Sequence, residues 1–357
     1  MPAESRREFL RHASTLTLTI PGLGLVLAAC AAPDDRARRA PGNGAGGQTP
    51  AVPNPDSRLD TSLPAAGAGT AAGPNAAAVV YARVDPALPA LTPGRTQRIH
   101  FHSREAQIRI ADDTVVGAWT FDGRMPGPVI HCRVGDTVEF TLTNDVAMPH
   151  SMDFHAAQID PKTAFRSALK GQSVTFSFSP RYAGAFLYHC GTSPVLLHLG
   201  SGMFGAIIVS PREPLPRARE FVLVQSEMYL GAPVNGVRPF DYSRMLSTLP
   251  DFVCFNGRPD QYGREPLRVR RGDRVRFWVV NAGPTHPCAF HVVGEQFDTV
   301  YLGAPPGSAI HGIQTWAVPA GGGMCFELVT DVVGEFVFVN HAFGHGQKGA
   351  IGRLVVT

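Results

Sequence analysis

A cysteine and several other potential metal ligands lie within one short segment. Cys190 directly follows His189, and His198 and Met203 come after it in the stretch LYHCGTSPVLLHLGSGMFG. A further histidine, His150, lies upstream in MPHSMDFH. Two imidazoles, one thiolate and one thioether form a soft ligand set that suits copper cycling between Cu(I) and Cu(II), with the methionine as a weak axial ligand. We therefore predict a copper site at His150, Cys190, His198 and Met203.

The position of His189 beside Cys190 predicts a second metal site. Adjacent residues on a strand point to opposite faces, so His189 and Cys190 do not easily bind the same ion. His155 follows His150 by five residues, and His341 ends the corresponding strand of the second half in NHAFGHG. We predict that His155, His189 and His341 hold the second metal, joined to the first by the peptide between His189 and Cys190.

The elements that must position these residues are two copies of one design. The first half has VGDTVEFTLTN (134–144) and the second has RGDRVRFWVVN (271–281), each a Gly-Asp turn followed by an alternating strand. Each half then carries two histidines five apart and a later strand, GAFLYHC or GEFVFVNH. Abundant Gly (38) and Pro (31), with no long amphipathic helix, favour an all-β fold. The pattern predicts two tandem β-sandwiches, over residues 79–214 and 215–357.

The second half serves as an internal control for the first. Asn340 stands opposite Cys190, and Gln347 stands near the place of Met203. Residues that both sandwiches needed for packing would recur in both, so the Cys-His-Met set points to a function of the first half alone. His286 echoes His150 without its partners, and we expect a relic or a hydrogen-bonding residue there. The role of His345 is left open.

The N-terminal region predicts export and a lipid anchor. Arg6-Arg7 precede an apolar stretch, and residues 1–30 have the pattern of a twin-arginine signal peptide. The end of this stretch, Leu-Ala-Ala-Cys, resembles a bacterial lipobox, so that Cys30 would be lipidated; a plain signal peptide is the alternative. Residues 31–78 are rich in Ala, Gly and Pro and are expected to form a flexible tether. We expect a periplasmic protein that reaches the outer membrane only through its lipid.

Composition excludes several other classes of protein. The net charge is +3 and no basic run is interleaved with aromatic residues, so nucleic acid is not an expected partner. Six cysteines without CxxC pairs indicate neither a zinc ribbon nor a dense disulfide framework. The redox state of Cys254, Cys288 and Cys325 is left open. No CxxCH haem motif occurs, so we expect a separate electron donor.

Together these motifs make residues 80 to 357 resemble the copper-containing dissimilatory nitrite reductases, a family of two-domain cupredoxins. The resemblance rests on WTFDGRMPGP, HSMDFH, YHCGTSPVLLHLGSGMFGAIIV, FHVVGEQFD, VPAGG and NHAFGHGQKGAIG. The short loop between Cys190 and His198, without a tryptophan before the histidine, is similar to the subgroup that includes lipid-anchored outer-membrane members.

The resemblance implies two coppers per subunit and a shared active site. It implies two tandem cupredoxin-like domains, with type 1 copper at His150, Cys190, His198 and Met203 and type 2 copper at His155, His189 and His341. The family draws the third type 2 ligand from the neighbouring subunit, which implies a homotrimer with His341 at a subunit interface. The potential and colour of the type 1 copper are not readable from sequence.

The resemblance also implies a reaction and the residues that carry it. Asp153 and His291 match the two catalytic positions, and Val293 matches a small aliphatic residue that walls the substrate pocket. The implied reaction is the one-electron reduction of nitrite to nitric oxide and water in denitrification, with Asp153 and His291 handling protons. Electrons would come from a small cytochrome c or a cupredoxin and pass through His189 and Cys190 to the second copper.

Two other functions are alternatives. A laccase-like multicopper oxidase needs eight histidines, largely in HxH pairs, and an HCH around the cysteine, whereas here Gly191 follows Cys190. His100 and His102 form an HxH, but they precede the Gly-Asp strand and are expected to be surface or structural residues. A non-catalytic electron carrier would need only the first site, which would leave His155, His189 and His341 without a purpose.

Overall fold

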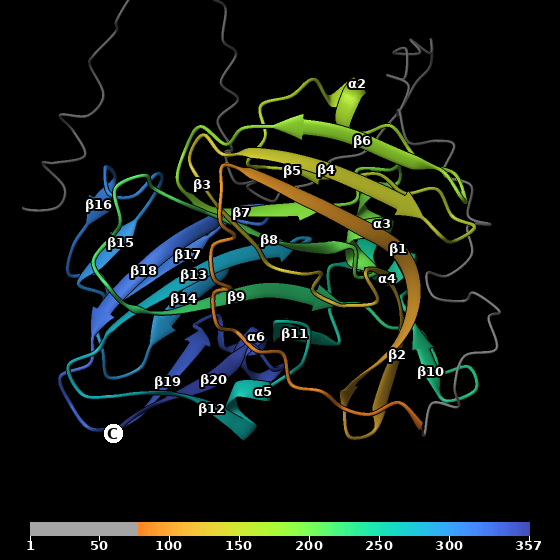
Figure 1. The fold of residues 1–357 in the computed structure, drawn as a ribbon. Coiled ribbons are helices and arrows are strands. Elements are labelled where there is room, and N and C mark those ends of the chain that lie inside the picture. Colours follow the sequence, from red (N-terminus) through yellow and green to blue (C-terminus); the bar gives the residue numbers. More distant parts are fainter. Residues whose placement is uncertain (1–77) are drawn as a thin grey trace, which may run out of the picture. The chain divides into compact units, whose positions relative to one another are not determined.

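The prediction of an all-β fold with two tandem cupredoxin-like sandwiches is confirmed. The computed structural model describes residues 78–357, which form strands with a few helices of four to six residues (Figure 1). The strands sort into four sheets, two built mainly from the first half and two from the second. Within residues 78–357 no helix has the length and apolar character needed to cross a membrane.

The first half contributes a five-stranded and a four-stranded sheet. The five-stranded sheet runs in the order β10 (Val237–Pro239), β2 (Thr114–Phe121), β1 (Thr96–Ala111), β4 (Thr137–Asn144) and β6 (Ser173–Phe178). The four-stranded sheet runs in the order β3 (Ile130–Arg133), β8 (Phe204–Ser210), β7 (Gly184–His189) and β5 (Asp153–Phe154). Because β10 comes from the second half of the chain, the first sheet is completed by a segment beyond its own sandwich.

The second half contributes a six-stranded and a five-stranded sheet. The larger runs in the order β11 (Phe252–Phe255), β9 (Arg219–Met228), β13 (Arg274–Gly283), β18 (Gly323–Val329), β15 (Thr299–Tyr301) and β16 (Ala309–Ile310). The smaller runs in the order β12 (Glu265–Val269), β20 (Ile351–Val356), β19 (Gly334–Asn340), β14 (Cys288–Val292) and β17 (Thr315–Val318). The short helices are α2 (Pro161–Ala164), α3 (Val195–Gly200), α4 (Tyr242–Ser247), α5 (Gln261–Arg264) and α6 (Phe343–Gln347).

The repeat recognised in the sequence recurs in the strand pairing. Strand β4 pairs in parallel with β1 and antiparallel with β6, and β13 pairs in the same way with β9 and β18. Strand β8 pairs in parallel with β3 and antiparallel with β7, and β20 pairs in the same way with β12 and β19. Each strand of one half that carries a predicted ligand therefore has a structural counterpart in the other.

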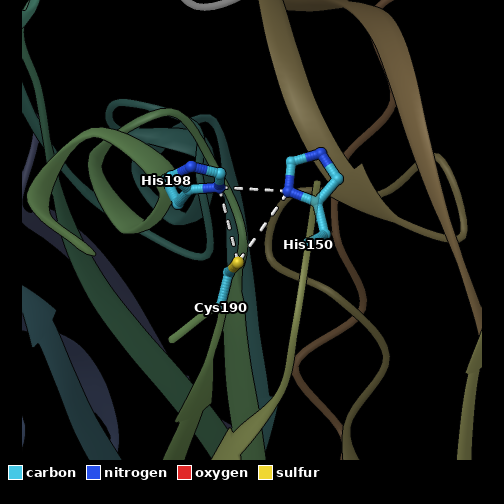
Figure 2. A group of neighbouring side chains, drawn as sticks. All are labelled: His150, Cys190 and His198. Atoms are coloured by element: carbon cyan, nitrogen blue, oxygen red, sulfur yellow. Dashed lines mark hydrogen bonds between the residues drawn. The ribbon is translucent and has the colours of Figure 1, made fainter. Parts of the chain in front are cut away.

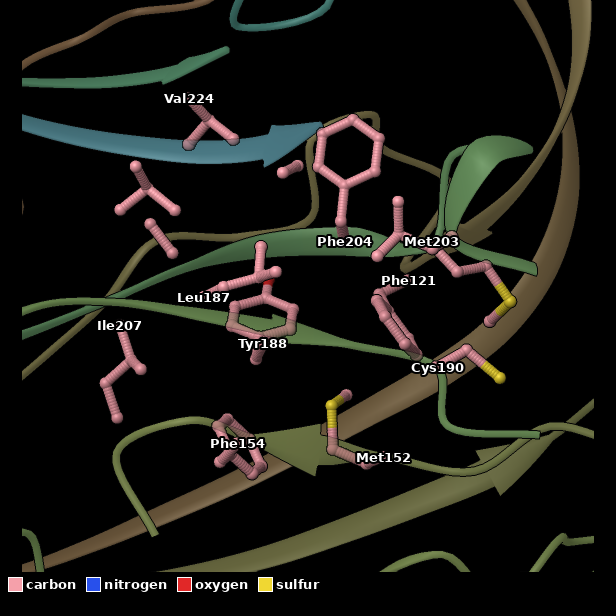
Figure 3. Packing of buried hydrophobic residues seen from close by; sticks show 14 of the residues in the cluster. Phe121, Met152, Phe154, Leu187, Tyr188, Cys190, Met203, Phe204, Ile207 and Val224 are labelled. Carbon is pink, nitrogen blue, oxygen red and sulfur yellow. The ribbon is translucent and has the colours of Figure 1, made fainter. Parts of the chain in front are cut away.

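Burial explains why these segments form strands. Every second residue of β4 and β6 is buried, which is the pattern of strands with one face on a core. In contrast, β13 is buried along nearly its whole length. The larger core cluster joins residues of both halves, and it includes Phe204 of β8 and Val224 of β9 (Figure 3). The two sandwiches thus share apolar surface, which fixes the second half against the strands that carry the predicted ligands.

The N-terminal predictions remain predictions. Residues 1–30 with Cys30, and all but the last residue of 31–78, lie outside the described residues. The domain boundaries at 79–214 and 215–357 likewise stay predictions.

Candidate metal centres

The end of β7 brings the predicted first site together. Cys190 follows the last residue of β7, and its backbone N–H donates to the Met203 carbonyl at 3.1 Å, which closes the loop between them. His198 lies in α3 within that loop. His150 arrives from another loop, held by a pair of backbone hydrogen bonds with Ala168. Segments that are far apart in sequence therefore meet at one end of the first sandwich.

Three potential donor atoms of the first site converge (Figure 2). The Nδ1 atoms of His150 and His198 are 3.0 Å apart, and the Cys190 Sγ lies 3.4 Å from His198 Nδ1 and 3.8 Å from His150 Nδ1. All three residues are buried. The backbone N–H of Ser151 also points at Sγ from 3.4 Å, a contact that favours a thiolate.

The donor set fits copper chemically. Burial, and secondarily the neighbouring His198, lowers the pKa of His150 to about 3, while burial lowers that of His198 to about 4. Both rings are therefore neutral ligands near pH 7. Burial raises the pKa of the Cys190 thiol, so the thiolate needs a cation beside it. The buried Nε2 of His150 has no hydrogen-bond partner, which leaves no other polar role visible for this ring.

Met203 and Trp119 complete the surroundings. Met203 is fully buried, and Figure 3 shows its sulfur and the Cys190 sulfur directed to the same side of the sheet. Trp119 packs on both histidine rings, with ring centroids 5.4 Å from His150 and 4.9 Å from His198. The sequence patterns did not single out Trp119 as a site residue, because only the fold brings β2 over this loop.

A second cluster forms around His189, the neighbour of Cys190. The Nε2 atoms of His155 and His189 are 3.1 Å apart, and Asp153 Oδ2 lies 3.5 Å from His189 Nε2 and 3.8 Å from His155 Nε2. Asp153 and His189 are paired across β5 and β7. The structure therefore brings His155 and His189 together with Asp153, apart from the triangle around Cys190.

Hydrogen bonds prepare these two histidines to bind a metal ion. His155 Nδ1 lies 2.9 Å from the Gly321 carbonyl, and His189 Nδ1 lies 2.9 Å from the Cys190 carbonyl. A carbonyl oxygen only accepts, so each Nδ1 carries the proton and each neutral ring has its lone pair on Nε2. Two lone pairs facing each other at 3.1 Å repel unless a cation lies between them. Burial lowers the pKa of His189, which keeps its Nε2 unprotonated and available as a ligand.

The remaining predicted residues gather elsewhere in the chain. The His291 and His341 rings have centroids 5.2 Å apart, on β14 and just after β19. His291 Nδ1 donates to the Gln314 carbonyl at 2.5 Å, which leaves the lone pair of the neutral ring on Nε2. Val293 is 47% exposed, and His341 is exposed as well. Within residues 78–357 His341 belongs to neither cluster of potential ligands, so one chain presents two incomplete parts of the predicted second site.

The strand register corrects two correspondences expected from the sequence. The Cys190 N–H bonds the Met203 carbonyl, and the Asn340 N–H bonds the Ala350 carbonyl, so Ala350 rather than Gln347 occupies the place of Met203. Similarly, His291 lies opposite Val339 just as Asp153 lies opposite His189. His291 is therefore the counterpart of Asp153, and not of His155 as the five-residue spacing indicated.

An apolar cavity of about 310 Å³ adjoins the second cluster. Its lining combines the two histidines with aliphatic residues of both halves: His155, Leu187, His189, Val195, Leu196, Leu199, Ala282, Pro284, Ala320 and Gly321. Apolar walls around a few polar groups are typical of small-molecule sites, because they exclude water and strengthen the remaining polar contacts.

The other candidate residues have local partners. His100 Nε2 is 2.8 Å from Thr143 Oγ1, and His102 Nδ1 is 2.9 Å from Asp145 Oδ2, so this HxH pair is bonded to the neighbouring strand edge. The described cysteines form no disulfide: Cys132, Cys190, Cys254, Cys288 and Cys325 are all buried and free. Cys254, Cys288 and Cys325, whose redox state the sequence leaves open, are therefore free thiols in this structure.

Known proteins combine this fold with copper chemistry. Residues 102–214 match the family described as multicopper oxidase. The chain is 37% identical over 268 residues to the copper-containing nitrite reductase of Neisseria meningitidis, which covers 72% of this chain and 69% of that protein. Copper nitrite reductase from Nitrosomonas europaea superimposes with a TM-score of 0.69 at 35% identity, covering 73% of this chain and 94% of that one. A solved multicopper oxidase gives 0.66 at 25% identity, covering 76% and 94%.

Replacing Cys190 tests the separation of the two clusters. We expect copper-loaded Cys190→Ala to lose the intense visible absorption of a thiolate–copper bond and to retain the copper held at His155 and His189, whose Nε2 atoms belong to a separate cluster. Absorption spectra and metal analysis of the purified protein measure both. Cys132→Ala, which removes another buried thiol of the first half, should keep the absorption. A visible band that survives in Cys190→Ala contradicts the first site.

Proposed function

This chain belongs to the family of copper-containing nitrite reductases, and from that premise we propose how its residues divide the reduction of nitrite to nitric oxide and water. The observation that carries the proposal is the pair of Nε2 atoms of His155 and His189, which lie 3.1 Å apart. His189 directly precedes Cys190, a member of the buried first ligand set. Copper held by the first set would supply one-electron redox chemistry, and copper held by the second would supply a Lewis acid for a nitrite oxygen.

The chain links the two ligand sets directly. His189 and Cys190 share a peptide bond, and the His189 Nδ1–H donates to the Cys190 carbonyl at 2.9 Å. His189 of the second set is thus joined to Cys190 of the first set in two ways, through the peptide bond and through this hydrogen bond. We propose that this pair is the route by which an electron accepted from a small cytochrome c or a cupredoxin reaches the substrate site.

Asp153 is placed to handle the first proton. Nitrite needs two protons and one electron to give nitric oxide and water. The Asp153 carboxylate lies within 4 Å of both Nε2 atoms and keeps 25% of its side chain exposed, so it can exchange protons with solvent. A group in this position can hold a proton at Oδ2 and donate it to the oxygen that leaves as water.

His291 is proposed to handle the second proton, from a neighbouring subunit. The bond from its Nδ1–H to the Gln314 carbonyl fixes the ring, so that protons are taken up and released at Nε2. His291 and His341 lie together, and Val293, two residues after His291, is exposed. We propose that these three residues of one subunit complete the His155–His189–Asp153 cluster of the next, in a homotrimer closed by head-to-tail contacts.

A multicopper oxidase activity is the second candidate, favoured by the match over residues 102–214. Reduction of dioxygen to water in such enzymes needs a cluster of histidines that binds three coppers. Within residues 78–357 the potential metal ligands form only the His150–Cys190–His198 and Asp153–His155–His189 groups. The HxH pair His100 and His102 is bonded to Thr143 and Asp145 instead. Nitrite-dependent nitric oxide formation, without oxygen consumption on a phenol, would separate the two activities.

Mixed oligomers test the shared site. His155→Ala and His341→Ala should each abolish nitric oxide formation alone. When the two variants are co-expressed with different affinity tags and purified through both tags, activity should return, because a His155 chain and a His341 chain can meet at one interface. Every mixed trimer that carries both tags has one restored interface out of its three, so about a third of the sites should regain activity. If His341 served its own chain, every site in the mixture would lack one histidine, and no activity would return.

Substitutions of the proton-handling residues should separate chemistry from metal binding. We expect Asp153→Asn and His291→Gln to lower kcat for nitrite by about 10²- to 10³-fold, while copper content and the visible band remain. His311→Gln is a matched control, since the His311 Nδ1 also bonds a backbone carbonyl, that of Asp298, at 2.8 Å. Wild-type kcat in either Asp153→Asn or His291→Gln would remove that residue from the mechanism.

The proposed lipid anchor depends on one side chain. Cys30→Ala should be exported and fold, yet partition with the soluble periplasmic fraction rather than with the outer membrane, because a thioether-linked lipid can no longer form. Fractionation and mass spectrometry of the mature N-terminus measure this. A Cys30→Ala protein that remains in the membrane fraction would refute lipidation, and the nitrite reductase activity of the soluble form controls for folding.

A further inference from the structure

Three buried amide side chains form a continuous hydrogen-bonded relay in the second half. Asn340 Nδ2 donates to Gln225 Oε1 at 2.8 Å, and Gln225 Nε2 donates to Asn281 Oδ1 at 3.2 Å. All three residues are completely buried. We propose that the Asn340–Gln225–Asn281 relay is a positioning element that holds both protein parts of the second copper site: the carbonyl that orients His155 and the loop that carries His341.

One end of the relay holds the carbonyl that orients His155. The backbone of Asn281 pairs with the Gly321–Gly322 turn, accepting from the Gly321 N–H at 2.8 Å and donating to the Gly322 carbonyl at 2.9 Å. The Gly321 carbonyl in turn accepts from His155 Nδ1–H at 2.9 Å. The position of the Asn281 strand end therefore sets the oxygen that fixes the tautomer and direction of a copper-binding imidazole.

The other end of the relay holds the loop of His341. Asn340 Oδ1 accepts from the Ala289 N–H at 3.2 Å and from the Ala342 N–H at 3.1 Å. The Ala289 carbonyl accepts from the His341 N–H at 2.7 Å. The amide of Asn340 thus bonds Ala342, which follows His341, and Ala289, whose carbonyl accepts from the His341 N–H. Rotation of this amide would release both restraints on the histidine.

The first half shows that the sandwich itself does not require the relay. Asn144 is the counterpart of Asn281, and its side chain bonds only backbone groups, donating to the Met148 and Ala168 carbonyls and accepting from Val146 N–H. Asn281 makes the same three kinds of bond, with His286, Val318 and Gly283. Gln225 and Asn340 are additions, and Asn340 occupies the position that Cys190 has in the first half.

The relay is built to be rigid. Asn340 Nδ2 has three acceptors within reach, Gln225 Oε1 at 2.8 Å, the Pro287 carbonyl at 3.2 Å and His345 Nδ1 at 3.3 Å. Both Asn281 amide hydrogens reach backbone carbonyls. Gln225 accepts at one end and donates at the other, so it joins two otherwise separate anchors. Buried networks with satisfied donors hold one arrangement, whereas removal of the middle member leaves two amides partly unpaired.

Each chain would in this way position a ligand of two different copper sites. The Gly321 end acts on the site of its own chain, and the Asn340 end acts on the His341 that the chain offers to its neighbour. This inference rests on the proposed function for the second of these sites, because it takes His341 as a ligand of the neighbouring subunit. The Gly321 end depends only on contacts within one chain.

Gln225→Met is the main test, because methionine has a similar shape and cannot bridge Asn281 and Asn340. We expect the affinity of the full trimeric protein for the second copper to fall about 10- to 100-fold, measured by competition with a copper chelator. The electron paramagnetic resonance signal of the remaining second copper should change, whereas the visible thiolate–copper band should stay. Wild-type affinity with a wild-type signal in Gln225→Met would overturn the proposal.

Gln261→Met is the matched control for a general loss of stability. Gln261 is also a buried glutamine of the second half, with its amide bonded to the Phe255 and Asn256 carbonyls and to the Val84 N–H, outside the relay. The Gln261→Met substitution should lower the unfolding temperature, while the second copper stays bound with wild-type affinity. An equal loss of the second copper in both variants would show that instability, and not positioning, is the cause.

Two further variants keep the outcomes distinguishable. If Gln225→Met fails to fold, Gln225→Glu retains the shape of the side chain. The ratio of its affinity for the second copper to that of wild type should rise as pH falls, because only a protonated carboxyl can donate to Asn281. A ratio that does not change with pH would count against the relay. His341→Ala is measured in parallel. Retention of the second copper in His341→Ala would overturn the shared site. Loss of the second copper in His341→Ala, together with its retention in Gln225→Met, would overturn only the relay.

Discussion

The alternation of side chains at the end of one strand is the constraint on which this molecule depends. His189 and Cys190 are consecutive, yet each belongs to a different cluster of potential ligands. A strand cannot turn both side chains to one ion, so a two-metal arrangement follows from two adjacent residues. The same adjacency places the donors of the two sites a single peptide apart, with the His189 Nδ1–H bonded to the Cys190 carbonyl.

The duplicated sandwich allows one half to bind metal and the other to support it. In the first half, the loop after β7 carries His198 and Met203 and closes over Cys190. In the second half, the corresponding strand ends in Asn340, whose side chain forms hydrogen bonds instead of a metal bond. Because both halves share one packed core, the Gly321 turn of the second half can reach His155 of the first. The supporting half thus sets the direction of a ligand that it does not contain.

Local periodicity predicted much of this, and long-range contacts account for what it missed. The two-residue strand period separates His189 from Cys190, and the repeated Gly-Asp strands correctly predicted matching sheets. The Gly321 carbonyl at His155 and the packing of Trp119 over the first cluster join segments distant in sequence, so no local pattern indicates them. The sequence pattern puts Gln347 near the place of Met203, but the loop after β19 reaches the same ladder position at Ala350.

The strand register gives the two residues proposed to handle protons a common origin in the fold. Asp153 lies opposite His189 and His291 lies opposite Val339, so they occupy one position in the two repeats. A head-to-tail ring brings the first half of one subunit against the second half of the next. Equivalent faces of the two sandwiches would then meet across the interface, and equivalent positions would face the same substrate. In the proposed homotrimer, duplication followed by ring closure would therefore bring a carboxylate and an imidazole to one shared site without any new element of structure.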